Sequence, residues 1–357
     1  MKGIDFPVFK TKVEGVTQKF NLNDPDGRRQ YFAAKAGAEI EKLKKYLEGN
    51  TFVAYLIGKK NSGKGTYSKL FAEAVGSEYI SHLSVGDIVR DVHRKLSDLE
   101  AKEELIEFLE GNYRGFMPVE EAINAVVNKD QSTLIPSEMI VTLIKYEISK
   151  RSKKAIFVDG FPRALDQVSY SLFLKELIGY RDDPDFFVFI DLPEPVIEAR
   201  IKGRVICPKC NVPRNINLSP TKEIGYDETT KTFYLVCESL ACGGARMVPK
   251  EGDELGLEPI RERLEIDDQI FRQLVNLNGV PKVYLRNTVP VNKINEYIDD
   301  YEITPVYKYE YNSDTKKVEI KEESWVINDD NGVPSYSLLP APVALGLIKQ
   351  VAQVLNL

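Results

Sequence analysis

A glycine-rich segment after an apolar run is the feature that most restricts the fold of this 357-residue chain. Residues 52–57 are expected to form a buried parallel strand, and residues 66–74 a helix. Between them, residues 58–66 match the pattern G-x-x-x-x-G-K. In that setting, backbone N–H groups line one concavity and the helix N-terminus adds positive potential. The segment therefore predicts a loop that holds the phosphates of a nucleoside triphosphate, with Lys64 reaching the outer ones.

Bulk properties exclude several other classes of protein. The chain is mildly acidic, with a net charge of −6 and a pI near 5.4, which argues against a nucleic-acid or membrane surface as its main partner. It contains no run of eighteen apolar residues and no apolar signal core near its start, so we expect a cytoplasmic protein. In that compartment, four cysteines in two close pairs favour metal binding over disulfides.

Four further segments follow the glycine-rich loop in a specific order. They are residues 82–90 (HLSVGDIVR), residues 155–163 (AIFVDGFPR) with Gln167 four positions later, residues 199–204 (ARIKGR) and residues 260–264 (IRERL). Together with the loop, they resemble the adenylate kinase family of nucleoside monophosphate kinases, over roughly residues 52–300. The resemblance implies an α/β, three-layer P-loop fold with a parallel sheet, a helical monophosphate-binding (NMP-binding) subdomain and a small zinc-ribbon lid.

The arginines in these segments suit phosphoryl transfer on physical grounds. The reaction brings many negative charges together, so positioning and charge neutralisation dominate catalysis. A planar guanidinium can hold two phosphate oxygens at once. The candidates for this role are Arg90, Arg163, Arg200, Arg204, Arg261 and Arg263. For any single arginine, the alternative to phosphate binding is a solvated ion pair on the surface.

The resemblance also implies roles for individual residues. Lys64, Asp159, Arg163, Arg204 and Arg263 would take part in catalysis, with Asp159 orienting water around Mg²⁺ that bridges the donor phosphates. ATP would be bound by Gly58, Asn61, Ser62, Gly63, Lys64, Gly65, Thr66, Arg200 and Arg204. AMP would be bound by Ser84, Val85, Arg90, Gly160, Arg163, Gln167 and Arg263, with Gln167 reading its base.

The cysteines lie directly after the ARIKGR segment. Cys207 and Cys210 form one pair, and Cys237 and Cys242 form the other about thirty residues later. This spacing favours a four-thiolate zinc ribbon, which would be structural because it leaves no open coordination position. Four residues separate Cys237 from Cys242 where two are usual, so one ligand loop must bulge.

Three departures from the family pattern affect the details. Val85 stands where a small or hydroxylated residue is usual, so a pyrimidine acceptor stays open beside AMP. The family usually carries another arginine a turn before Arg261, and here Lys250 is the preferred replacement over Arg246. The segment of residues 91–134 is longer than in compact members of the family. Apolar positions within residues 99–109 are expected to form a local core. Ser137 is expected to cap the helix that follows this segment.

These observations divide the chain into segments. We expect an N-terminal extension (1–50), a P-loop core (51–90 and 135–205), an enlarged NMP-binding subdomain (91–134), a zinc-ribbon lid (206–250), a core continuation (251–302), a β-hairpin insertion (303–328) and a C-terminal core helix (329–357). In the hairpin, tyrosines at every second position suit either stacking on nucleic acid or a half-buried face, and the acidic surroundings favour the second.

The expected function is reversible phosphoryl transfer from Mg·ATP to a nucleoside monophosphate, with AMP as the first choice. UMP or CMP is the alternative acceptor. A nucleotide-binding regulatory protein without efficient turnover is an alternative from another class. ATP and the monophosphate are the expected partners, without nucleic acid or membrane, and we expect a monomer with structural Zn²⁺ in the lid.

Overall fold

The centre of the molecule is a parallel sheet of five strands. The computed structural model describes residues 2–4, 6–127 and 135–357, so the end of the expected NMP-binding subdomain, residues 128–134, lies outside the described residues. The strands are β1 (Val53–Gly58), β2 (Ile80–Ser84), β3 (Ala155–Asp159), β4 (Asp185–Asp191) and β10 (Lys282–Arg286), in the order β10-β4-β1-β3-β2. The predicted α/β fold with a parallel sheet is confirmed, and the carboxyl ends of these strands lie along one edge.

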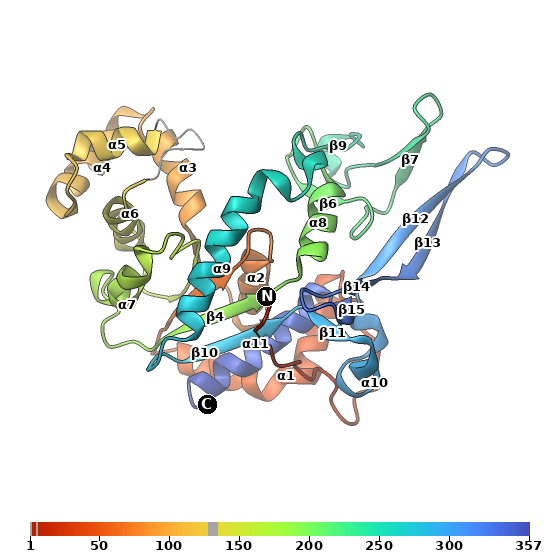
Figure 1. The fold of residues 1–357 in the computed structure, drawn as a ribbon, viewed down its shortest axis with the longest axis horizontal. Helices are drawn as coiled ribbons and strands as arrows, with labels where there is room; N and C mark the ends of the chain where they lie inside the picture. The colour runs from red at the N-terminus through yellow and green to blue at the C-terminus, as the bar shows by residue number, and fades with distance from the viewer. Residues whose placement is uncertain (1, 5, 128–134) are drawn as a thin grey trace.

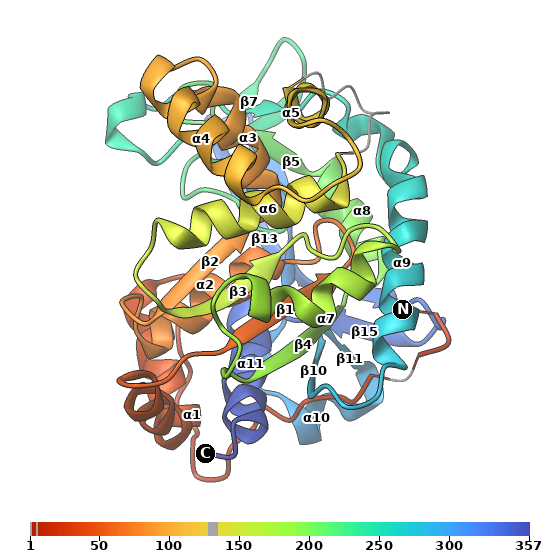
Figure 2. The ribbon, with the colours of Figure 1, turned by 90° about the vertical axis from the view of Figure 1, so that its left-hand side faces the viewer.

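Alternation along the central strand explains why both faces are covered. Val53, Tyr55 and Ile57 of β1 belong to one buried cluster, whereas Ala54 and Leu56 belong to another. Successive side chains of a strand point to opposite faces, so a strand that is apolar at every position needs a layer on each side. The result is a three-layer arrangement with two apolar cores (Figure 2).

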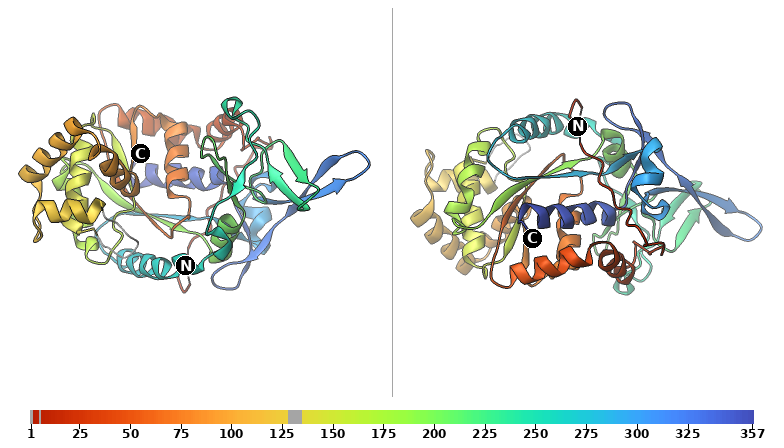
Figure 3. Two further views of the ribbon diagram at one scale, coloured as in Figure 1. Left: turned by 90° about the horizontal axis from the view of Figure 1, so that it is seen from above. Right: turned by 90° about the horizontal axis from the view of Figure 1, so that it is seen from below.

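One layer consists of α1 (Pro25–Leu47), α2 (Lys64–Val75) and α11 (Pro340–Val354). The helices α1 and α11 lie side by side on this face (Figure 3). Residues expected to form the N-terminal extension and the C-terminal core helix therefore meet on the same side of the sheet. Lys35 of α1 is fully buried there and pairs with Glu302 at 2.7 Å.

The opposite layer consists of α6 (Ser137–Ser149), α7 (Gln167–Leu177) and α9 (Arg261–Val275), with α3 (Val85–Lys95), α4 (Leu99–Asn112) and α5 (Val119–Val127) stacked beyond α6. Leu105 and Leu109 of α4 are buried as expected, but Leu99 is 82% exposed and does not join that core. The predicted cap at Ser137 is wrong, because Pro136 occupies the N-cap position and the Ser137 hydroxyl donates to Asp166 instead.

The cysteine-bearing segment forms a separate projection. It follows α8 (Glu194–Lys202) and contains the small sheet of β5 (Arg204–Ile206), β6 (Pro213–Asn215) and β9 (Val248–Pro249). A hairpin of β7 (Ile224–Asp227) and β8 (Thr232–Leu235) extends from it. We call residues 204–249 the lid.

The end of the chain adds two further sheets beyond β10. The strands β11 (Thr288–Pro290), β15 (Pro334–Ser337) and β14 (Val326–Asn328) form one; β11 follows β10 after a single residue, and the short helix α10 (Ile294–Tyr297) comes after β11. The strands β12 (Pro305–Asn312) and β13 (Lys317–Ser324) form the other, a long antiparallel hairpin within the segment expected to contain one. This C-terminal hairpin projects beside β7 of the lid (Figures 1 and 3). Within the described residues, no helix is both long and apolar enough to cross a membrane.

Candidate active site

The glycine-rich segment turns sharply between β1 and α2. Gly63 has a φ of 98° and Asn61 a φ of 65°, conformations in the left-handed region that glycine adopts without strain and asparagine tolerates. The helix α2 begins at Lys64, so its first N–H groups face the loop. The Lys64 ammonium donates to the carbonyl oxygens of Gly58 at 2.8 Å and Lys59 at 3.1 Å. The loop therefore folds around the lysine that was expected to reach phosphate.

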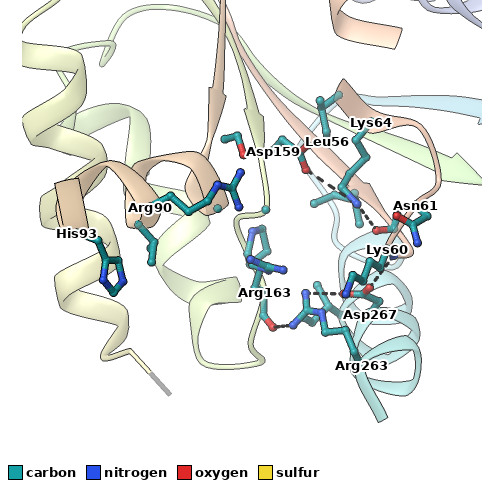
Figure 4. Close-up of a pocket in the computed structure, with 18 residues that line it drawn as sticks. Leu56, Lys60, Asn61, Lys64, Arg90, His93, Asp159, Arg163, Arg263 and Asp267 are labelled. Atoms are coloured by element: carbon teal, nitrogen blue, oxygen red, sulfur yellow. Dashed lines mark hydrogen bonds and ion pairs between the residues drawn. The ribbon is translucent and has the colours of Figure 1, made fainter. Parts of the chain in front are cut away.

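A cavity of about 520 Å³ opens beside this loop at the carboxyl ends of the strands (Figure 4). We call it the first cavity. Predicted site residues that line it are Gly58, Asn61, Lys64, Ser84, Arg90, Asp159, Gly160, Arg163 and Arg263. They come from β1, α2, β2, α3, β3 and α9, so the fold brings together side chains that are up to two hundred positions apart in sequence.

Lys64 and Asp159 face each other across the floor of this cavity. Asp159 ends β3, and its Oδ1 lies 3.9 Å from the Lys64 ammonium (Figure 4). Burial lowers the pKa of Lys64, while the carboxylates of Asp159 and Asp267 oppose that shift. His82 completes the group: its Nε2 lies 4.0 Å from Asp159 Oδ2, and its Nδ1 lies 2.9 Å from the Ser68 hydroxyl. Burial lowers the pKa of His82.

Two arginines form the opposite wall. Arg263 on α9 donates to the backbone oxygen of Arg163 at 2.7 Å and pairs with Asp267 at 2.6 Å. Asp267 also accepts from the backbone N–H of Lys60 at 3.1 Å, and burial raises the pKa of its carboxyl group. These contacts tie the glycine-rich loop, the segment after β3 and α9 into one wall, with the two guanidinium groups on the cavity side.

Two of the residues expected to contact the acceptor base lie directly behind the wall of the first cavity, beside Arg163 and Gly160. Gln167 is 5% exposed, and its side-chain oxygen accepts from the Arg163 backbone N–H at 2.8 Å. Val85, the first residue of α3, is 3% exposed and packs in the apolar core. Neither is among the residues that line the cavity, whereas Arg90 and Ser84 nearby are. Arg90 is well exposed and pairs with Asp87 on its own helix.

Two more of the candidate arginines, Arg200 and Arg204, face a second cavity, of about 500 Å³, on the other side of the glycine-rich loop. Gly63 and Thr66 also line it. The Arg200 guanidinium donates to the Asn61 oxygen at 3.3 Å. Arg204 holds both carboxylate oxygens of Asp253, at 2.5 and 2.6 Å. The expected donor-side residues therefore lie together, in a space that shares Asn61 with the first cavity.

The remaining predicted ATP-site residues lie in the loop itself. Ser62 is fully buried, and its hydroxyl has no hydrogen-bond partner in the described part of the chain. At Gly65, an added Cβ would lie 3.6 Å from His82 and 3.9 Å from Asp159. The absence of a side chain there keeps the space beside the Asp159 carboxylate open.

Sequence reasoning missed His82, His93, Lys60 and Asp267. The first lies beside Asp159, and the other three line the first cavity. A usable signal existed only for Asp267, which stands four positions after Arg263 and therefore on the same face of a helix. Lys250, the preferred replacement for the missing arginine, lies close enough to contribute to lowering the pKa of Lys60. Arg246 is engaged elsewhere, pairing with Asp227 at 2.8 Å, and Arg261 pairs with Glu258 at 3.0 Å on the outside.

The four cysteines converge in the lid. One ligand atom from each lies within 4.8 Å of the others, and the Cys210 and Cys237 sulfurs are 3.7 Å apart. Zinc–sulfur bonds of about 2.3 Å in a tetrahedron place sulfurs about 3.8 Å apart, so the donor set fits a zinc ion. The extra residues before Cys242 form a short 3₁₀ turn, Leu240–Cys242, closed by Gly243 in the left-handed conformation. Backbone hydrogen bonds from Cys210 and Lys209 lower the pKa of Cys207 to about 6.

Comparison with known proteins agrees with this arrangement. No protein-family model matches the chain. The adenylate kinase of Clostridium acetobutylicum is 30% identical over 242 residues, which cover 67% of this chain and 89% of that protein. The adenylate kinase of Thermotoga neapolitana is 31% identical over 175 residues, which cover 48% of this chain and 67% of that protein. The adenylate kinase of Thermotoga maritima is 28% identical over 243 residues, which cover 67% of this chain and 84% of that protein. The chain therefore belongs to the adenylate kinase family of nucleoside monophosphate kinases.

Proposed function

We propose that the protein catalyses reversible phosphoryl transfer from Mg·ATP to AMP, giving two ADP. One observation carries the proposal: Lys64, Arg90, Arg163 and Arg263 meet around a single cavity beside the glycine-rich loop. Four cationic side chains in one space suit two polyphosphates that must approach each other closely. The names of the relatives support AMP as the acceptor.

The two cavities suggest how the substrates are arranged. ATP would lie with its triphosphate on the loop and its nucleoside in the second cavity, near Arg200. AMP would lie in the first cavity with its phosphate between Arg90 and Arg163. The transferred group would then pass beside Lys64, whose ammonium is already held over the loop by two carbonyl oxygens. Catalysis would consist of alignment and neutralisation of charge, since the acceptor phosphate needs no side-chain base.

The site fits a magnesium ion at Asp159. Its carboxylate lies at the carboxyl end of β3 and lines the first cavity, whose volume of about 520 Å³ has room for hydrated Mg²⁺. Bound with ATP, the ion would neutralise charge on the donor phosphates. We propose that Asp159 orients the water around it, and that His82 and Lys64 fix the position of the Asp159 carboxylate.

The four thiolates are proposed to bind a structural Zn²⁺. Their sulfur positions fit a closed tetrahedral site, so the ion would have no open position for a substrate. Its role would be to hold the lid rigid. A rigid lid that covers the phosphates excludes water, which would otherwise compete as the acceptor.

The acceptor base is the least constrained part of the proposal. Gln167 reaches the Arg163 backbone, and Val85 packs in the core. For Gln167 to read adenine, its side chain would have to turn from this contact when AMP binds. This position is the specific observation that keeps UMP or CMP as an alternative acceptor.

A turnover assay tests the proposed reaction. Purified protein with Mg·ATP and AMP should form two ADP for each AMP consumed, and Lys64→Ala should reduce kcat by about 10²- to 10³-fold, the usual cost of removing one group that stabilises transition-state charge. Equal and negligible rates in both proteins, with ATP still bound, would favour a nucleotide-binding regulator.

A further inference from the structure

Trp325 joins the C-terminal hairpin to β14 and lines the second cavity. It is the single tryptophan of the chain. One part of its side chain packs against the apolar cluster that covers α8, which includes Val196 and Ile201, and the rest is exposed. A partly exposed indole on the wall of a cavity needs a reason beyond core packing, because the cluster uses only part of its surface.

The residues that line the second cavity are of the kinds expected in a nucleoside site. Gly63 and Thr66 of the phosphate-binding loop line one side, and Arg200 lines another. The Arg200 guanidinium is fixed by the Asn61 carbonyl and by the hydroxyl of buried Tyr67. The volume of the second cavity, about 500 Å³, lies within the range of small-molecule pockets. A planar cation and an indole on the walls of one such space can both stack on a nucleobase.

The segment that carries Trp325 is held firmly against the loop. Asp330, in the turn after β14, accepts from the buried Lys59 ammonium at 3.0 Å. Its other carboxylate oxygen accepts from the Glu194 backbone N–H at 2.8 Å, at the start of α8. The turn therefore joins the glycine-rich loop to α8, and Trp325 lies five residues before it. A contact fixed in this way is already in place when the ligand arrives, so little ordering cost accompanies binding.

We infer that Trp325 is a donor-binding residue, and that its indole stacks on the base of ATP in the second cavity. The inference rests on the proposed function, because it assigns the second cavity to the donor nucleoside. It places a donor contact in the segment between the C-terminal hairpin and β14. Stacking is tolerant of the base, since every base has a π-face, so the contact should add affinity more than selectivity.

Intrinsic fluorescence offers a direct test, because all tryptophan emission comes from this one position. The full-length protein is titrated with ATP and, separately, with inorganic tripolyphosphate, while calorimetry records binding of each. Tripolyphosphate can occupy the loop and close the lid but carries no base. We expect ATP to quench the emission and bound tripolyphosphate to leave it nearly unchanged.

Two variants complete the test through kinetics. Trp325→Leu keeps an apolar cover over α8 but removes the π-face, and it should raise KM for ATP about ten-fold, the size of one lost base–aromatic stack, with KM for AMP unchanged. Trp325→Phe keeps a stacking ring and should recover most of the affinity. It also serves as the folded reference if the leucine variant is unstable.

The outcomes separate this inference from the proposed function. Binding of ATP without a change in emission, or equal KM for ATP in wild type and both variants, would overturn the role of Trp325 and leave the kinase proposal intact. Equal quenching by bound tripolyphosphate would also overturn it, because the signal would then come from lid movement. Absence of ATP binding altogether would overturn both.

Discussion

The two projections that flank the active site are held in different ways. The acceptor arm, which we define as α3, α4 and α5, packs on α6, the next helix along the chain. Lys95 of α3 pairs with Glu147 of α6 at 2.5 Å, and Lys145 of α6 donates to Asn112 of α4 at 2.8 Å. The lid, by contrast, is contacted by a segment far away in sequence. The hydroxyl of Tyr309 donates to the Ile216 oxygen, across 93 positions.

The C-terminal hairpin makes this distant contact along the length of the lid (Figure 3). At its base, the Tyr307 backbone N–H donates to the Asn217 oxygen at 2.8 Å. Further out, the rings of Tyr311 and Tyr226 stack with centroids 4.2 Å apart, and the Tyr311 hydroxyl donates to Glu228 at 2.7 Å. The alternating tyrosines thus face the lid. Any movement of the lid must either carry the hairpin along or break these contacts.

From this difference we expect the two arms to move independently of each other. The acceptor arm is held by the helix that follows it in the chain, and its contacts to α6 span 33 to 52 positions, fewer than the 93 positions between Tyr309 and Ile216. The lid contains the cysteine cluster that we propose binds zinc, and the C-terminal hairpin contacts it from outside. Four experiments test this difference between the arms and the site between them.

Loss of the metal site should have the largest effect, and only on the lid. Removal of zinc by a chelator, or Cys237→Ser, should loosen residues 204–249 and lower kcat by about 10²-fold, because misplaced positioning groups are costly in a reaction that depends on alignment. Limited proteolysis should then cut within the lid but spare the acceptor arm. Cleavage that is equally fast in both arms would show that they are not independent.

Replacement of an arginine in the acceptor arm should raise the KM of one substrate only. Arg90→Ala would remove the charge-assisted hydrogen bonds that we propose to the AMP phosphate, and it should raise KM for AMP by about 10- to 100-fold with KM for ATP unchanged. Arg94→Ala is the matched control, since Arg94 is on the same helix, is also exposed and pairs with Asp91. Equal effects of the two substitutions, or a rise in KM for ATP, would contradict the assignment.

The tyrosine contacts should have a smaller effect, visible in dynamics. Tyr311→Ala removes the ring stacked on Tyr226 and should speed hydrogen exchange of lid amides by about 2- to 10-fold, the equivalent of one aromatic pair. Tyr311→Phe keeps the stacked ring, so its lid amides should exchange at a rate between those of wild type and the alanine variant. Amides of the acceptor arm should not change. Unchanged lid exchange in the alanine variant would show that the hairpin does not restrain the lid.

The stability that His82 contributes, at the floor of the first cavity, should depend weakly on pH. Burial lowers the pKa of His82, so the folded protein binds a proton there less readily than the unfolded chain, whose histidine pKa is about 6.5. The stability that neutral His82 contributes is present above that pH and is lost as the pH falls through the lowered folded pKa. In urea unfolding between pH 7.5 and 5, His82→Gln should show a shallower loss of stability than wild type. Parallel curves would assign the dependence to other groups.

Local patterns account for the parts of the molecule that the sequence predicts well. The glycine-rich loop, Asp159 at the end of its strand and Arg163 four residues later depend on spacing within one segment, and each lies where that spacing implies. The cysteine cluster was predictable for the same reason, since cysteines in two close pairs are a spacing typical of a metal site.

Contacts between distant segments account for the rest. Ser137 is a favourable cap by type, but Pro136 takes that position and the hydroxyl finds Asp166, 29 residues away. Alternation predicts a hairpin with one tyrosine face, yet nothing local indicates that the face lies against the lid. Asp330 and Trp325 are similar cases, because Lys59, the partner of Asp330, and part of the lining of the second cavity, such as Gly63 and Thr66, belong to the other end of the chain.

The most direct test of the proposed function is an acceptor panel. The protein with Mg·ATP is offered AMP, GMP, CMP, UMP and dTMP in turn, and formation of ADP is followed for each. We expect a clear preference for AMP. A preference for UMP or CMP would contradict the assignment of AMP, and no turnover with any acceptor despite tight ATP binding would contradict the kinase function itself.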